Sequence, residues 1–191
     1  TGMLYDVDVI TVVTEKLTIY APCYVVLDPV MVAKGGAKLI TDAAIFALQN
    51  YLFSHVFLIT PNIPEAEVLL GQSIATKAEM AQAALLLAQK YQLNVLVKGG
   101  HLSSHASCDV LYDIQQARLE WFDAERIDTQ NTHGTGCTFS SAIATFLAFG
   151  YDLQAAVREA KAYLTRAILL GRDYELGHGH GPVDHFGARI L

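Results

Sequence analysis

The sequence predicts an α/β fold with a doubly wound, mostly parallel sheet and helices on both of its faces. Short apolar runs rich in β-branched residues alternate with longer segments whose apolar residues recur at helical spacing. These short runs are apolar throughout, which is typical of strands buried on both faces. The chain has 191 residues, of which 52% are hydrophobic, and this length is enough for one substantial core. We therefore expect a single domain over residues 1–191.

The first hundred residues contain three cycles of helix and strand. Pro64 lies four residues beyond the end of the second strand-like run and favours the start of a helix there. In chain order we expect a helix over 4–17, a strand within "YVVLDPV" (24–30), a helix over 42–52, a strand at "VFLIT" (56–60), a short helix from Pro64, a helix over 77–91 and a strand within "NVLVKGG" (94–100).

The pattern changes after Gly100. Two strand-like runs, 109–114 and 118–127, are joined by "QQA" and predict an antiparallel hairpin added to the sheet. A helix that begins near Cys137 and another over 153–170 follow. The tail at 176–186 is too rich in glycine for a helix, so we expect an ordered loop there.

Composition excludes several classes of partner. The formal net charge of -6 provides no basic surface for a phosphate backbone or an anionic membrane, so we expect no nucleic-acid partner and no membrane partner. Charge or Gly/Pro interrupts every apolar run before the roughly 20 residues that a membrane span needs. The three cysteines form no CxxC pair, and the start shows no signal-peptide pattern. We expect a cytoplasmic protein that acts on a small molecule.

Polar residues follow the strand-like runs at the same end of the predicted sheet. They are Asp28 after the first run, Asn62 and Glu65 after the second, Lys98 after the third, and the turn from Gly134 to Cys137 before a helix. Ligands of open parallel sheets bind beyond the carboxyl ends of the strands. We therefore expect these four groups to surround one crevice.

The stretch "NTHGTGC" combines glycines with the start of a helix. Gly134 and Gly136 allow the backbone to approach a ligand, and the first N–H groups of the helix lack intrahelical partners. Together they predict an anion site. The alternative is a tight turn in which Cys137 packs as a small hydrophobic residue, because the motif is neither a Walker A sequence nor a complete GxGxxG.

Each of the other polar residues also has two interpretations. Lys98 is either a phosphate ligand or a solvated residue at a strand end. Asn62 and Glu65 either hold a hydrated Mg²⁺ or cap the helix that Pro64 opens. Asp28 is either part of the same site or the start of a turn before Pro29. Their expected convergence, rather than any one residue, favours the functional interpretation.

Four stretches, "DPVMVAKGG", "TPNIPEAEVLLG", "VLVKGGH" and "NTHGTGCTFSSAIA", resemble successive signatures of the ribokinase superfamily. Within it, the chain is most similar to the hydroxymethylpyrimidine kinase/phosphomethylpyrimidine kinase branch. The resemblance extends in order from "TGM" to "GHGHGP". It implies a ribokinase-like fold whose N-terminal portion is missing from this chain.

The resemblance also implies a role for each matching residue. Gly134, Thr135 and Gly136 would form the anion hole, and Lys98 would contact the terminal phosphates of ATP. Asn62 and Glu65 would organise Mg²⁺, with Asp28 near the same charge. The remaining implied residues are Met3 and Val30, which would line the pyrimidine site, and Cys137, which stands where most of the superfamily carries an aspartate base.

Cys137 is chemically suited to that place. A helix N-terminus and nearby cations favour the thiolate form of a cysteine, and a thiolate accepts the proton of a hydroxymethyl group or orients a substrate phosphate. Phosphoryl transfer depends mainly on positioning and charge neutralisation, so a weak base is sufficient.

The resemblance implies an ATP-dependent kinase of thiamine biosynthesis that phosphorylates 4-amino-5-hydroxymethyl-2-methylpyrimidine and then its monophosphate, and that forms a homodimer. One alternative is a pyridoxine/pyridoxal kinase, because cysteine-bearing relatives also accept B6 vitamers. The other is a nucleotide-binding fragment without catalysis. His178 and His180 lack a partner cluster at metal-ligand spacing, which favours a structural loop over a zinc site.

Overall fold

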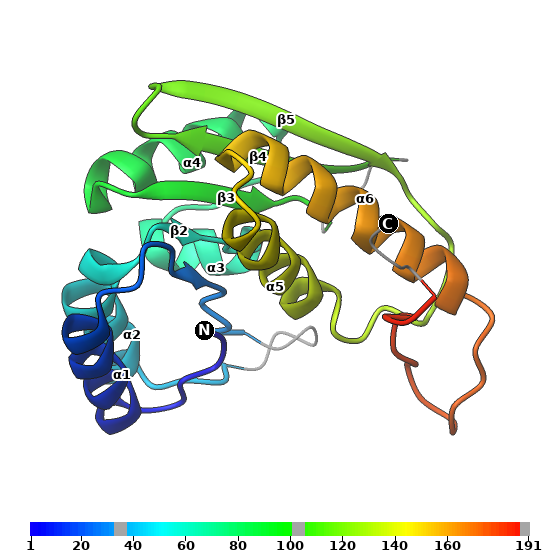
Figure 1. Ribbon diagram of the computed structural model, residues 1–191, viewed down its shortest axis with the longest axis horizontal. Coiled ribbons are helices and arrows are strands. Elements are labelled where there is room, and N and C mark those ends of the chain that lie inside the picture. Colours follow the sequence, from blue (N-terminus) through cyan, green and yellow to red (C-terminus); the bar gives the residue numbers. More distant parts are fainter. Residues whose placement is uncertain (33–37, 101–105, 188–191) are drawn as a thin grey trace. The chain divides into compact units, whose positions relative to one another are not determined.

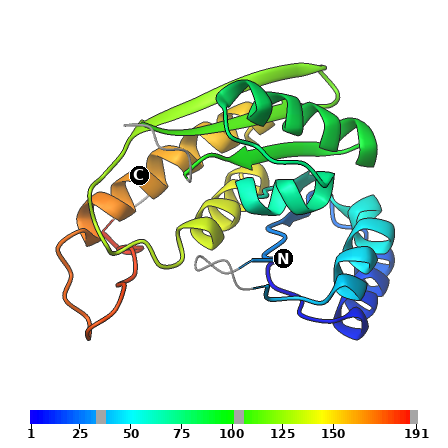
Figure 2. The same cartoon turned by 180° about the vertical axis from the view of Figure 1, so that it is seen from behind.

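The structure is a computed structural model that describes residues 1–32, 38–100 and 106–187. Figures 1 and 2 show its ribbon from two opposite sides. The elements in chain order are α1 (Val7–Tyr20), β1 (Val26–Leu27), α2 (Asp42–Ala47), the π-helix η1 (Leu48–Leu52), the 3₁₀ helix η2 (Phe53–His55), β2 (Leu58–Ile59), α3 (Ile63–Leu70), α4 (Lys77–Tyr91), β3 (Asn94–Lys98), β4 (Ala106–Asp113), β5 (Arg118–Glu125), α5 (Thr135–Ala148) and α6 (Leu153–Gly171).

The described strands form one mixed sheet in the order β1-β2-β3-β4-β5. β1 pairs with β2 and β2 with β3 in parallel, whereas β4 runs antiparallel to β3. A turn at 114–117 leads from β4 to β5, and the Asp113 carboxylate accepts the N–H groups of Gln115 and Gln116 there. The α/β class is therefore confirmed, as is the hairpin after the third strand.

The chain divides into two compact units. One unit contains residues 1–102 and 109–121, and the other contains 103–108 and 122–191. None of the helices in the described residues is long and apolar enough to cross a membrane.

Side-chain caps fix the starts of the helices in the first unit. Asn62 and Thr76 each form a capping box with the glutamate three residues later, at the starts of α3 and α4. α4 spans the residues expected from the sequence. α1 begins and ends three residues later than expected, because Asp6 is its N-cap and accepts the N–H of Val9.

Two expectations for the first unit are wrong in detail. The helix expected over 42–52 is α-helical only to Ala47 and continues as η1. The strands expected over 24–30 and 56–60 are paired as β1 and β2 only at two residues each. Apolar composition predicts a buried extended segment, but it does not fix which of its residues enter the ladder, and single bonds such as that from the Thr60 N–H to the Leu27 carbonyl continue beyond it.

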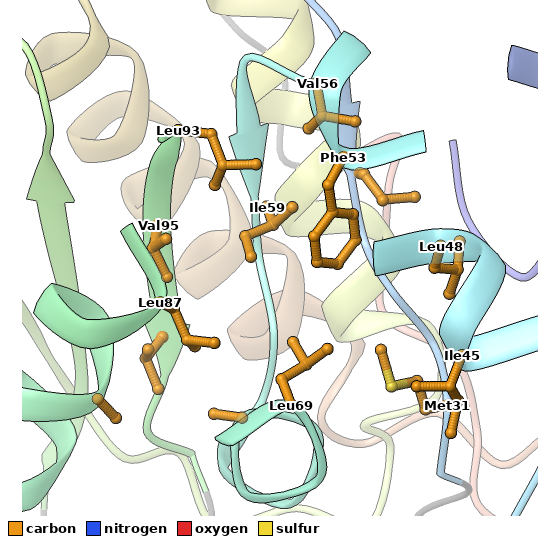
Figure 3. Packing of buried hydrophobic residues seen from close by; sticks show 14 of the residues in the cluster. Met31, Ile45, Leu48, Phe53, Val56, Ile59, Leu69, Leu87, Leu93 and Val95 are labelled. Carbon is orange, nitrogen blue, oxygen red and sulfur yellow. The ribbon is translucent and has the colours of Figure 1, made fainter. Parts of the chain in front are cut away.

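The core of the first unit lies between one face of the sheet and the helices α1 to α4. Figure 3 shows part of it, with Ile59 and Val95 from the strands facing Leu69 and Leu87 from α3 and α4. The alternate strand residues Val26, Leu58 and Leu96 are also buried, although they are not members of this cluster. The strands are thus buried on both faces, as the sequence predicted.

In the second unit, α5 and α6 lie side by side (Figure 1). The apolar face of α5 includes Phe139, Ile143 and Phe146, all of which are buried. Beyond α6 the chain forms the predicted ordered loop. This loop returns to the start of α5, where His133 and Pro182 form a parallel bridge.

Candidate functional site

An ion pair joins the ends of two strands in the first unit. Lys98 Nζ donates to Asp28 Oδ1 at 2.7 Å, and the two residues are 70 positions apart in the sequence. The side chains are 13% and 5% exposed, so water screens the pair only weakly. The structure therefore brings together two of the residues that the sequence placed at one edge of the sheet.

Asn62 and Glu65 form a capping box at the start of α3. Asn62 Oδ1 accepts the Glu65 N–H at 2.9 Å, and Glu65 Oε2 accepts the Asn62 N–H at 2.8 Å. Glu65 Oε1 also accepts the N–H of Met31, at 3.2 Å. Asn62 in turn forms a parallel bridge with Lys98. The capping interpretation is thus confirmed, and the box lies next to the strand that carries Lys98.

Burial raises the pKa of Glu65, because the ionised carboxylate loses its hydration at 2% exposure. The positive charge of Lys98 is the largest influence in the opposite direction, and the N–H bonds from Asn62 and Met31 also lower the pKa. Asp28 raises the pKa further by like-charge repulsion. The positive charge of Lys98 therefore offsets the repulsion between two buried carboxylates, Asp28 and Glu65.

Removing the ammonium of Lys98 should make folding more sensitive to pH. The pKa of Glu65 is raised in the folded protein, so native Glu65 still binds a proton at pH values where the unfolded chain has released it. The free energy of unfolding therefore falls as pH rises from the ordinary pKa of 4.5 to the raised pKa of the native state. Lys98→Met should raise this pKa further and steepen the fall. Urea unfolding between about pH 4.5 and pH 7 measures the slope.

The control is Lys90→Met, since the Lys90 ammonium binds the Leu69 carbonyl rather than a carboxylate of the site. It should leave the slope unchanged. If Lys98→Met also left the slope unchanged, the ammonium would not be the charge that balances Glu65.

The backbone after Asp28 turns sharply. Val30 has a φ of 27°, which is rare for a β-branched residue and indicates local strain. The turn brings the N–H of Met31 to Glu65, and the Met31 side chain is fully buried. Met3, the other residue expected to contact the pyrimidine, is 48% exposed. The assignment of Met3 and Val30 to a substrate site stays a prediction.

The second unit holds the Gly134 to Cys137 turn. Gly134 is the N-cap of α5 with a φ of 83°, a left-handed conformation that favours glycine, and it provides no side-chain cap. A Cβ built on Gly134 would have no atom within 4 Å. The N-terminal end of α5 is therefore an uncapped helix start with open space beside it, as an anion site requires.

Cys137 lies in the first turn of α5 and is exposed. The interpretation of Cys137 as a buried hydrophobic residue is therefore wrong for this structure. Next to it is a surface depression of about 350 Å³. Its lining residues, all from the second unit, are Cys137, Thr138, Ser141, Ala142, Thr145, Tyr163 and His185. Thr138 and His185 are hydrogen bonded to each other, at 2.8 Å between Oγ1 and Nε2.

Asn131, which sequence reasoning did not identify, connects the turn to the C-terminal loop. Its Nδ2 donates to the carbonyls of Gly171, Arg172 and Tyr174 at 2.8 to 3.2 Å, and its Oδ1 accepts the Gly181 N–H at 2.9 Å. A Cβ at Gly181 would lie 2.8 Å from Asn131 Cγ, so only glycine fits there. No local pattern indicates this role, because all of these partners are 40 or more residues away in sequence.

Asn131→Ala should destabilise the protein by about 2–4 kcal/mol, because it leaves several buried backbone groups without partners. Chemical denaturation measures the free energy of unfolding. The control is Asn50→Ala, which removes one exposed bond to the Phe46 carbonyl and should cost less than about 1 kcal/mol. Equal small losses would show that water replaces the Asn131 amide without penalty.

The structure thus describes two groups of expected site residues. Asp28, Asn62, Glu65 and Lys98 lie together in the first unit, and the Gly134 to Cys137 turn lies in the second. His180 Nδ1 lies 3.1 Å from the Gln130 carbonyl. Within the described ranges, no group of three or more His, Cys, Asp and Glu residues is arranged to hold a metal, and this includes the loop with His178 and His180.

Comparison with known proteins places these features in a family. The model of the phosphomethylpyrimidine kinase family matches residues 1–184. The thiamine biosynthesis bifunctional protein ThiED of Geobacter sulfurreducens is 50% identical over 98% of this chain, which spans only 38% of that protein. The hydroxymethylpyrimidine/phosphomethylpyrimidine kinase of Escherichia coli is 42% identical over 98% of this chain and 70% of its own length.

Solved structures agree with this placement. An ADP complex of Bacillus subtilis pyridoxal kinase has a TM-score of 0.87 and 36% identity, over 97% of this chain and 68% of that one. Phosphomethylpyrimidine kinase of Clostridium difficile has a TM-score of 0.75 and the same identity, over 87% of this chain and 67% of that one. Because the family model covers nearly the whole chain and both units, the chain belongs to the phosphomethylpyrimidine kinase family.

Proposed function

We propose that the protein is a kinase of thiamine biosynthesis that transfers the terminal phosphoryl group of ATP to 4-amino-5-hydroxymethyl-2-methylpyrimidine and then to its monophosphate. The observation that carries the proposal is the family match over residues 1–184. This match includes both the Lys98–Asp28 ion pair and the uncapped start of α5. We further propose that the two units belong to one kinase domain that forms a homodimer.

Lys98 and the N-terminal end of α5 would bind the phosphates of ATP. Lys98 carries a positive charge at the carboxyl end of β3. The first N–H groups of α5 point outward from a helix start that has no side-chain cap. Gly134 and Gly136 would allow close approach of an anion to these groups, and Thr135 between them would complete the anion hole. Charge neutralisation of this kind supplies most of the catalysis in phosphoryl transfer.

Asn62, Glu65 and Asp28 fit a hydrated Mg²⁺ rather than a directly coordinated one. Asn62 Oδ1 and both Glu65 oxygens already accept backbone N–H bonds, and Glu65 is buried. Their remaining acceptor capacity suits the water molecules that Mg²⁺ retains in proteins. When bound, Mg²⁺ would neutralise part of the phosphate charge of ATP. These residues would hold it through water.

Cys137 would accept the proton in the first phosphorylation. The hydroxymethyl oxygen attacks the terminal phosphorus, a new O–P bond forms, and the bond to the bridging oxygen breaks as ADP leaves with the electron pair. The Cys137 thiolate takes the proton that the hydroxymethyl oxygen loses. The exposed thiol and the depression beside it leave room for a substrate at this position.

A second candidate function is the phosphorylation of pyridoxal. The solved structures that resemble this chain include pyridoxal kinases of Bacillus subtilis and Staphylococcus aureus, with TM-scores of 0.87 and 0.85. Pyridoxal also carries a hydroxymethyl group on an aromatic ring, so the same proton acceptor and phosphate site would serve it.

Substrate comparison tests the proposal. The intact protein, MgATP and one acceptor at a time should give a higher kcat/KM on hydroxymethylpyrimidine and its monophosphate than on pyridoxal. Turnover of pyridoxal alone would establish the second candidate. Binding of ATP without turnover of any acceptor would make the protein a nucleotide-binding module.

A further inference from the structure

Thr60 carries a buried hydroxyl group without a hydrogen-bond partner. The residue is fully buried, and Oγ1 has no partner among the described residues. Buried polar groups in native proteins nearly always have partners, because desolvation without a compensating bond is unfavourable. An unpaired hydroxyl beside a functional site therefore needs an explanation.

Thr60 lies in the ladder of the parallel strands, one residue beyond β2. Its N–H donates to the Leu27 carbonyl at 2.9 Å, and the next residue, Pro61, accepts the N–H of Lys98 at 2.8 Å. Ile59 packs into the core cluster, as Figure 3 shows. Because side chains alternate along a strand, Thr60 points to the opposite face.

The Lys98–Asp28 ion pair occupies that same face. Leu27 and Val97, the residues before Asp28 and Lys98, belong to the core cluster, so Asp28 and Lys98 also point away from it. β2 lies between β1 and β3, so the 2.7 Å contact bridges across the end of β2. Asp28 and Thr60 each follow one residue of the paired Leu27 and Ile59, so they stand next to each other just beyond two neighbouring strands, whose usual spacing is about 4.8 Å.

We propose that Thr60 is a positioning residue whose hydroxyl donates to the Asp28 carboxylate when the Lys98 ammonium leaves it to bind a phosphate. A hydroxyl can donate to a carboxylate after rotation about one side-chain bond. Asp28 is buried, so loss of the ammonium without a replacement donor would oppose the movement of Lys98. Thr60 lowers that cost and remains unpaired while the ion pair is closed.

This proposal deepens the proposed function and rests on it for the identity of the phosphate. Its physical core is independent of activity, because it concerns only which donor Asp28 uses. Replacing Lys98 by Met removes the ammonium permanently and should therefore hold the hydroxyl in the bond to Asp28.

A double-mutant cycle tests this exchange of partners. In the unmutated background, Thr60→Val removes an unpaired buried hydroxyl at nearly constant shape and should raise the melting temperature by about 2–6 °C. In the Lys98→Met background, Thr60→Val should lower it by a similar amount. The control is Tyr91→Phe, which removes a second unpaired buried hydroxyl among the described residues, at the end of α4, and should be stabilising in both backgrounds.

Kinetics provide the second readout. Thr60→Val should lower kcat by about tenfold to a hundredfold, whereas Thr60→Ser, which keeps the hydroxyl, should restore most of it and Tyr91→Phe should have no effect. If Lys98→Met does not fold, ATP replaces it in the cycle. Thr60→Val should then reduce the rise in melting temperature that saturating ATP produces.

The outcomes separate the two proposals. Thr60→Val with the same sign in both backgrounds would overturn the exchange of partners, as would a stabilised variant with unchanged kcat. Joint loss of stability and activity in the unmutated background would show that the hydroxyl has a permanent partner, which also overturns it. A sign reversal without turnover of any acceptor would support the exchange and refute only the kinase function.

Discussion

Cys137→Ala should reduce the phosphorylation of hydroxymethylpyrimidine by about 10²–10⁴-fold in kcat, which is the usual contribution of a general base. The phosphorylation of the monophosphate should fall far less. In the first reaction a neutral hydroxymethyl group must lose a proton as its oxygen attacks, whereas in the second the attacking phosphate oxygen is already anionic. Cys137→Asp should recover part of the first activity. Initial rates on the two substrates, with the same enzyme preparation, measure the difference.

The matched control for this experiment is Ser141→Ala. Ser141 is in the next turn of α5 and lines the same depression, so its substitution tests whether any change there impairs turnover. Equal loss of both activities in Cys137→Ala would instead indicate that Cys137 shapes the anion site. An unchanged first reaction would leave the thiol without a part in proton transfer.

Lys98→Met should lower kcat/KM for ATP by about 10²–10³-fold with either pyrimidine substrate, comparable with the loss of one donor to a developing anion. The decrease in kcat/KM should be the same for both reactions, because the transferred phosphoryl group is the same. Lys98→Arg should retain part of the activity, since the charge remains but the guanidinium is a wider, planar donor.

The effect of Lys98→Met on stability must be measured separately from its effect on activity. Lys98→Met leaves Asp28 buried without its ion-pair partner, which typically costs about 3–5 kcal/mol. Asp28→Asn in the same background removes the unpaired charge and should restore stability without restoring ATP use. If the double variant recovered activity as well, Lys98 would act on folding and not on phosphate.

Regular features of the site were predictable because they depend on local sequence. The Asn62 cap, the helix after Pro64 and the arrival of Asp28 and Lys98 at one edge follow from strand runs, proline and capping residues. The lengths of β1 and β2 were not predictable, since composition indicates burial but not where backbone pairing ends.

Other features of the site depend on contacts that no local pattern encodes. The bond from Met31 to Glu65 requires the positive φ of Val30, and the Asn131 network joins segments 40 to 50 residues apart. The unpaired hydroxyl of Thr60 follows from an ion pair between strands on either side of it. Sequence reasoning identified charged residues that the structure brings together, and it missed the long-range contacts of Asn131 and the buried hydroxyl of Thr60.

We expect Lys98 and the N-terminal end of α5 each to contact a phosphate of the bound nucleotide. A crystal structure of the intact protein with MgADP and a phosphate analogue, such as aluminium fluoride, tests it most directly. In that structure Lys98 Nζ should contact the transferred group or the terminal phosphate of ADP, and so should the backbone N–H groups of Gly136 and Cys137. A structure in which Lys98 stays bound to Asp28 while the phosphates contact α5 alone would contradict it.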